Sequence, residues 1–228
     1  MNNNINKDWV KYGSICGLIS AGTYIILNVI MNIPDISIPH SIIRIAFFCV
    51  GIFGVVSVGG LYHLIKKHKN GVLLQMAVLL SVIAFAFFTL MAVIQETTGV
   101  FWQESLVINQ SGENVNSIWA AVDAVQLGVD ITFDIFYTLT FILYSILMFN
   151  HPRFGKILSI SGLILFSSLL FFNLFTFPHP PTSKGFFDIG PITGLWALVV
   201  IIQSLRSIKW MDQENIDIMT KTTTHNKE

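Results

Sequence analysis

Six long apolar stretches dominate the pattern of this chain, and polar segments separate them. They run over about 13–31, 42–65, 72–94, 125–148, 157–177 and 189–208. A helix needs about 20 mainly apolar residues to cross the roughly 30 Å hydrocarbon core of a membrane, because its backbone must be hydrogen-bonded internally there. Each stretch meets that length. The pattern predicts an all-α fold, a polytopic transmembrane six-helix bundle that forms a single membrane domain over 1–228.

The polar segments are short, except for one between the third and fourth stretches. We expect this outer loop to cover 95–124, where the chain has four acidic residues and no Lys or Arg. Asn116 or Ser117 fits the N-cap of the fourth helix, since a short polar side chain accepts a hydrogen bond from the first backbone N–H groups. The polar tail over 212–228 is expected to be disordered.

The Lys and Arg residues predict the orientation in the membrane. Cations in short loops are retained on the cytoplasmic side. If both termini are cytoplasmic, all of the 13 Lys and Arg except Arg44 and Lys184 fall on that side. We therefore expect both termini to be cytoplasmic, and the loop over 95–124 to lie outside.

The composition agrees with membrane insertion. Hydrophobic residues make up 53% of the chain and charged residues only 11%, whereas a soluble domain carries about a quarter charged residues. A formal net charge of zero gives no basic excess for nucleic acid. The expected partner is the lipid bilayer, with no nucleic acid.

The cysteines and histidines show no redox or metal motif. Cys16 and Cys49 fall at different depths of their spans, too far apart for a disulfide. The six histidines have no spacing typical of metal ligands, so neither a metal nor a cofactor is expected. One alternative is a three-dimensional metal site on the outer side, drawn from His40, His179, Glu96, Asp123 and Asp188.

Two aspartates inside the fourth apolar stretch are the sharpest feature. Asp130 and Asp134 are four residues apart, which places both on one face of a helix. Asp at the centre of a span costs about 2.5–3.5 kcal/mol, so these side chains should not face lipid. Arg44 lies near the outer end of the second stretch, so an ion pair with Asp130 is geometrically allowed. No comparable cation is available for Asp134, and two carboxylates in a medium of low dielectric should titrate jointly.

This polar face suggests a pocket that opens to the outside and binds or passes a small ion or polar solute. Its candidate residues share one helix face or lie within reach of it, and they are Asp130, Asp134, Asp123, Gln126, Tyr137, Arg44, Glu96 and Asn173. Two alternatives stay open. The aspartates could fix helix register in a structural or regulatory subunit, or serve an intramembrane hydrolase. No nucleophile elbow or H-E-x-x-H motif supports an enzyme, so no catalytic residue is assigned.

Small residues recur at helical spacing in two places. Gly13, Gly17 and Ala21 form one ladder, and Gly190 with Gly194 forms another. Such ladders let helix backbones approach closely in lipid. They fit packing within the chain or the face of a homo-oligomer, and the sequence does not separate the two.

Motifs in the second half resemble a known family. They are Gly128-Val-Asp-Ile-Thr-Phe-Asp-Ile-Phe, His151-Pro-Arg-Phe-Gly-Lys, Phe177-Pro-His-Pro-Pro and Gly185-Phe-Phe-Asp-Ile-Gly-Pro. Together they resemble a bacterial family of small multi-span membrane proteins described as a domain of unknown function. The resemblance implies a bacterial inner (plasma) membrane and six spans, and it implies no activity.

Two of these motifs also predict helix ends. Proline lacks an N–H and restricts the residue before it, so Phe177-Pro178 should end the fifth helix. Asp188 is then placed to cap the sixth helix, with Pro191 in its first turn.

Overall fold

The structure is a computed structural model that describes residues 3–31, 33, 39–107 and 113–225 of the chain. The described residues form six α-helices, one short 3₁₀ helix and no strand. The elements are α1 (Asn3–Met31), α2 (His40–Lys66), α3 (Val72–Val107), α4 (Glu113–Met148), α5 (Gly155–Thr176), η1 (Pro181–Lys184) and α6 (Gly190–His225). All six α-helices in this described part are long and apolar enough to cross a membrane. The predicted all-α fold is confirmed.

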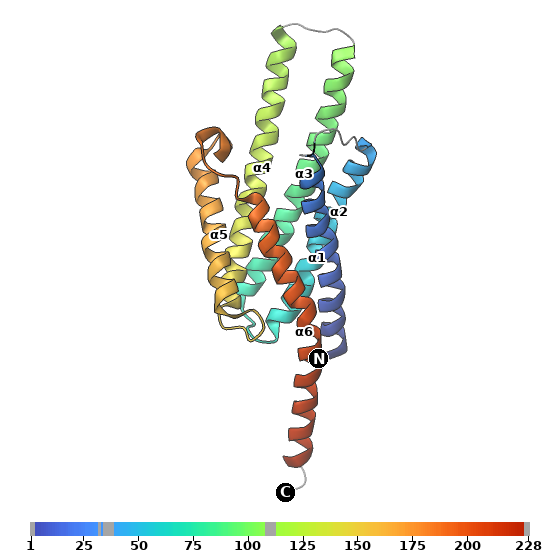
Figure 1. The fold of residues 1–228 in the computed structure, drawn as a ribbon, viewed down its shortest axis with the longest axis vertical. Coiled ribbons are helices and arrows are strands. Elements are labelled where there is room, and N and C mark those ends of the chain that lie inside the picture. Colours follow the sequence, from blue (N-terminus) through green and yellow to red (C-terminus); the bar gives the residue numbers. More distant parts are fainter. Residues whose placement is uncertain (1–2, 32, 34–38, 108–112, 226–228) are drawn as a thin grey trace.

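The helices pack in an order that closes almost into a ring. Each helix from α1 to α5 packs on the next one in the chain, and α6 returns to pack against α1 while touching α5 much less. Both termini lie at one end of the bundle, which we call the terminal end (Figure 1). The tips of α3 and α4 lie at the opposite end, which we call the α3–α4 end.

The region expected to be an outer loop is largely helical. α3 continues to Val107 and α4 begins at Glu113, so both helices extend past the rest of the bundle (Figure 1). The prediction that Asn116 or Ser117 is the N-cap of the fourth helix is wrong, because α4 already begins at Glu113. A polar composition predicts exposure to water, but 95–107 contains no proline to stop a helix that enters from the membrane span.

The C-terminal tail differs from the sequence prediction in a similar way. Residues 212–225 continue α6 as a helix, where the polar composition suggested disorder. No Gly or Pro follows Gly194 in this part of the chain, so no local signal ends the helix.

The connection between α5 and α6 follows the predicted signals. α5 ends at Thr176, directly before Phe177-Pro178. The backbone N–H of Gly190 donates to Oδ1 of Asp188 at 2.8 Å, so Asp188 caps α6 and Pro191 falls in its first turn. Both predictions are confirmed.

The glycine ladders hold α1 between α2 and α6. A Cβ added to Gly13 would lie 2.5 Å from the Cα atom of Gly60 on α2, so these two backbones are in direct contact. A Cβ on Gly194 of α6 would meet the ring of Tyr24 on α1 at 3.6 Å. The ladders are therefore used for packing within the chain.

Candidate functional site

A cavity of about 110 Å³ lies between α1, α2, α4 and α6, with smaller contributions from α3 and α5. Along α6 its wall runs from Gly190 to Ser204, which is about 21 Å at 1.5 Å per residue. Along α1 the wall runs from Ser14 to Tyr24. The cavity is therefore narrow, and it follows the bundle from near the α3–α4 end toward the terminal end.

Asp134 of α4 is the one carboxylate that the described residues contribute to the cavity wall. Its Oδ2 atom accepts a hydrogen bond from Nδ2 of Asn173 on α5 at 2.9 Å, and Asn173 is itself buried. No hydrogen bond to Oδ1 of Asp134 is found within the described part of the chain. One oxygen of a carboxylate at the cavity is therefore left for water or a ligand.

Two tyrosines flank Asp134 in the cavity wall. Tyr137 follows it by one helical turn on α4, and Thr193 of α6 lines the same cavity. Thr193 donates to the carbonyl of Gly190 at 2.7 Å. Tyr24 of α1 lines the same cavity, and Asp134 interacts with it electrostatically. Three helices thus converge on the carboxylate.

Aromatic rings form much of the remaining wall. The ring of Phe88 lies 6.3 Å from that of Tyr24 and 5.2 Å from that of Phe133. Phe133 is 5.2 Å from Tyr137, which is 4.7 Å from Phe141. These centroid distances are typical of favourable aromatic pairs. Five rings in contact thus line the cavity from α1 across α3 to α4.

Hydroxyl groups extend the wall toward the terminal end. Ser20 donates to the carbonyl of Val50 at 2.7 Å, and Ser204 donates to that of Val200 at 2.9 Å. Ser14 and Ser57 also line the cavity. A hydroxyl that donates to a carbonyl keeps its acceptor lone pairs, so these groups can still receive a hydrogen bond from a molecule in the cavity.

The sequence analysis missed the residues that α1 and α6 contribute, including Tyr24, Thr193 and the serines. A signal was present, because small and hydroxyl residues recur every three or four positions on both helices. That spacing is the same as for a packing ladder, and it does not distinguish a cavity wall from a close helix contact.

The rest of the predicted polar face of α4 leads away from the cavity. Asp130 is half-buried and lies one turn from Asp134 toward the α3–α4 end, outside the cavity wall. The charges of Asp130 and Asp188 both act on Asp134. Farther out, Gln126 is half-buried and Asp123 is exposed. The face therefore runs from the exposed part of α4 down to the cavity.

Arg44 and Glu96 pair with each other at the boundary of α2 and α3. Nε of Arg44 lies 3.2 Å from Oε2 of Glu96. This differs from the Arg44–Asp130 pair that the sequence allowed, and the helix order explains why. α2 packs beside α3, whereas Asp130 lies on α4, which packs between α3 and α5. Neither Arg44 nor Glu96 reaches the cavity wall.

The described residues contain no group of three His, Cys, Asp or Glu that could hold a metal ion. Cys16 and Cys49 are both free, so the prediction that they do not form a disulfide with each other is confirmed. Within the described part of the chain, no histidine or serine side chain is hydrogen-bonded to Asp130 or Asp134.

A fully buried titratable group lies at the terminal end, in the turn between α4 and α5. His151 is only 1% exposed, and its Nδ1 atom accepts from the backbone N–H of Arg153 at 3.2 Å. The rings of Phe154, His68 and Trp210 lie 4.9, 5.3 and 6.0 Å from it. Burial, with the charge of His68 adding to it, lowers the pKa of His151 to about 4. The imidazole is therefore neutral at pH 7.

Comparison of the chain with protein-family models, curated proteins and solved structures gives no match.

Proposed function

We propose that this membrane protein binds a small ion or polar solute in the cavity between α1, α2, α4 and α6 and passes it along the bundle, with Asp134 as the charged group. The observation that carries the proposal is the position of Asp134 in the wall of an elongated cavity, with a hydrogen bond from Asn173 to only one of its two carboxylate oxygens. A carboxylate oxygen that is withdrawn from bulk water and lacks a hydrogen-bond partner is costly. Water or a cationic solute in the cavity would compensate this oxygen, either through a hydrogen bond or through its positive charge.

The acidic face of α4 supports an approach from the α3–α4 end. Asp123, Asp130 and Asp134 follow one another toward the cavity, and Asp188 adds a further charge beside them. Acidic groups along an entrance raise the local concentration of cations. A positively charged solute is thus favoured over an anionic one.

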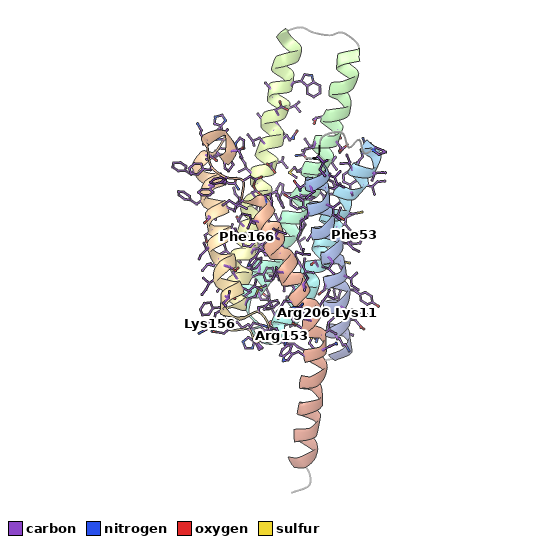
Figure 2. The ribbon with its side chains drawn as sticks, viewed as in Figure 1. Lys11, Phe53, Arg153, Lys156, Phe166 and Arg206 are labelled. Atoms are coloured by element: carbon purple, nitrogen blue, oxygen red, sulfur yellow. The ribbon has the colours of Figure 1, made fainter. Side chains whose placement is uncertain are left out.

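For the orientation we propose that the terminal end is cytoplasmic and the cavity opens outward, in a bacterial plasma membrane. Lys11, Arg153, Lys156 and Arg206 gather at the terminal end (Figure 2), together with both termini (Figure 1). Their placement is in line with the preference of Lys and Arg for the cytoplasmic side. The bacterial membrane rests on the resemblance described above.

A structural or regulatory subunit is the main alternative. The hydrogen bond from Asn173 to Asp134 joins α5 to α4 and would serve that purpose. It satisfies only one carboxylate oxygen, however, and Asp134 lines a cavity that α1 and α6 also border. A purely structural polar pair would be expected to pack without such space.

Thiol accessibility tests whether the cavity takes up water-soluble molecules. In a background with Cys16→Ser and Cys49→Ser, we compare Thr193→Cys with Thr176→Cys. The two threonines are 2% and 3% exposed and both lie at helix ends near the α3–α4 end, but Thr193 alone of the pair lines the cavity. A cationic, membrane-impermeant methanethiosulfonate reagent should modify Thr193→Cys and spare Thr176→Cys. An unreactive Thr193→Cys, or equal reaction of both variants, would contradict the proposed function.

The same experiment tests the orientation. Added to intact cells, the reagent should reach Thr193→Cys from outside. Modification seen only in inverted membrane vesicles would place the cavity entrance on the cytoplasmic side and overturn the proposed topology.

A further inference from the structure

The chemistry of the cavity wall indicates which class of solute fits. Asp134 supplies a negative charge, and the described part of the wall contains no Lys, Arg or His. Arg44, which the sequence allowed as a partner of Asp130, is paired with Glu96 instead. The charged form of a carboxyl group is unfavourable without a counter-ion, and a bound cation would stabilise that form of Asp134.

The rest of the wall favours a cation with an apolar coat. Tyr24, Phe88, Phe133, Tyr137 and Phe141 form a continuous series of rings beside Asp134. The face of an aromatic ring attracts a cation, and aromatic cages are the usual receptors for methylated ammonium groups. A carboxylate beside several rings therefore matches an alkylammonium group better than a strongly hydrated ion.

The ligands needed by a divalent metal ion are largely missing. Calcium takes about six to eight oxygen ligands, and magnesium needs about six in octahedral geometry. Asp134 offers one free oxygen, and no group of three metal-ligating side chains is found among the described residues. Most of the wall is carbon, which an alkylated cation tolerates and a bare metal ion does not.

The volume sets an upper limit on the size of the cation. An apolar cavity of about 150 Å³ holds a benzene molecule. The cavity here is about 110 Å³, which is room for about four or five heavy atoms by that comparison. Methylammonium and tetramethylammonium fall within this limit, and tetraethylammonium exceeds it.

We propose that the solute is a small organic cation of the alkylammonium class, held between the free oxygen of Asp134 and the aromatic rings that line the cavity. This inference rests on the proposed function and narrows it to one class of substrate.

Ligand-dependent thermal stability of the full chain in lipid nanodiscs tests the inference. The probes are the chlorides of sodium, potassium, ammonium, methylammonium, tetramethylammonium and tetraethylammonium at equal ionic strength. A ligand that binds the folded state raises the Tm. We expect the rise to increase from ammonium to tetramethylammonium and to disappear with tetraethylammonium.

Two substitutions separate the charge from the rings, each with a matched control. Asp134→Asn keeps an oxygen that can accept from Asn173 but removes the charge, and it should weaken tetramethylammonium binding at least tenfold. The exposed acid Asp8 at the terminal end provides the control Asp8→Asn, which should leave binding unchanged.

Phe88→Leu removes one ring of the cavity wall and should weaken tetramethylammonium binding several-fold. Phe87→Leu is the control, because Phe87 stacks on Phe136 at 5.7 Å and does not line the cavity. This pair keeps the inference testable if Asp134→Asn does not fold.

The outcomes distinguish this inference from the proposed function. Stabilisation by sodium or potassium that depends on Asp134, without any by alkylammonium ions, would overturn the inference and leave the function standing. A reactive Thr193→Cys, combined with no stabilisation by any alkylammonium ion, would also overturn the inference and leave the proposed function standing. Equal stabilisation of wild type and Asp134→Asn by tetramethylammonium would show nonspecific binding and overturn the inference. An unreactive Thr193→Cys would overturn the proposed function itself.

Discussion

Asp134 and His151 are both titratable groups enclosed by the bundle, but their surroundings differ. Asp134 has one hydrogen bond, one free oxygen and a cavity beside it. His151 is enclosed by Phe154, His68 and Trp210, and the cavity wall does not include it. Its Nε2 atom also has no hydrogen-bond partner among the described residues.

This difference shows that burial of a titratable group does not by itself indicate a binding site. A buried imidazole can lose its proton and become a neutral packing group, as the low pKa of His151 indicates. Asp134 adds two features that His151 lacks, which are adjoining free volume and a wall suited to the opposite charge. Those two features, rather than burial, identify the candidate site.

The largest effect we expect comes from acidifying the closed cluster around His151. The pKa of about 4 lies below the ordinary value of about 6.5, so the unfolded chain binds the proton more readily. The contribution of His151 to stability is therefore complete above pH 6.5 and is lost as the pH falls toward 4, by up to about 3 kcal/mol.

Unfolding followed by circular dichroism at pH 7 and at pH 4.5 measures this loss. His151→Gln cannot titrate and should lose less stability between the two values than wild type. Other groups titrate in both proteins and cancel in the comparison. An equal loss in the two proteins would mean that His151 does not become charged as the protein unfolds in acid.

A somewhat smaller effect should follow from removing the donor to Asp134. Asn173→Leu leaves the carboxylate without its one side-chain hydrogen bond and should destabilise the protein by about 1–3 kcal/mol. The double variant Asp134→Leu with Asn173→Leu should recover part of that loss, because replacing both partners removes the unmet polar group.

Thr176→Val is the control for this test, since the hydroxyl of Thr176 bonds only to a carbonyl of its own helix at 2.8 Å. The free energy of unfolding of these three variants, and of Asp134→Leu alone, is compared by thermal denaturation. Strictly additive losses in the double variant would contradict a coupling between Asp134 and Asn173.

Filling the cavity should weaken binding as well as stability. A Cβ on Gly54 would collide with the ring of Phe85, which lines the cavity and would be displaced into it. We expect Gly54→Ala to weaken tetramethylammonium binding several-fold and to destabilise the protein by about 1 kcal/mol. Gly22→Ala is the control, because no atom lies within 4 Å of its added Cβ. Unchanged binding in Gly54→Ala would mean that this volume is not the binding site.

The smallest effect is expected from the Arg44–Glu96 pair. The two side chains are 39% and 20% exposed, and pairs of this kind contribute about 0–1 kcal/mol. Arg44→Gln should change the Tm only slightly and leave tetramethylammonium binding as in wild type. A large change in binding would mean that Arg44 belongs to the site after all.

Much of the fold was predictable because its signals are local. Hydropathy marks the spans, and Phe177-Pro178 and Asp188 mark the end of α5 and the start of α6. The ends of α3, α4 and α6 beyond the membrane were not predictable in the same way. A polar segment outside a membrane can be helix or loop, and in the absence of proline the sequence pattern does not choose between them.

The sequence by itself determined the number of spans and the shared face of Asp130 and Asp134, since both depend on hydropathy and on the 3.6-residue helical repeat. The tertiary structure alone decided that Asp134 meets Asn173 of α5, Tyr24 of α1 and a cavity, while Asp130 does not line it. It also decided that Arg44 pairs with Glu96. These contacts join helices far apart in the chain, and they depend on the order of helices around the bundle, which the apolar pattern of each span does not encode.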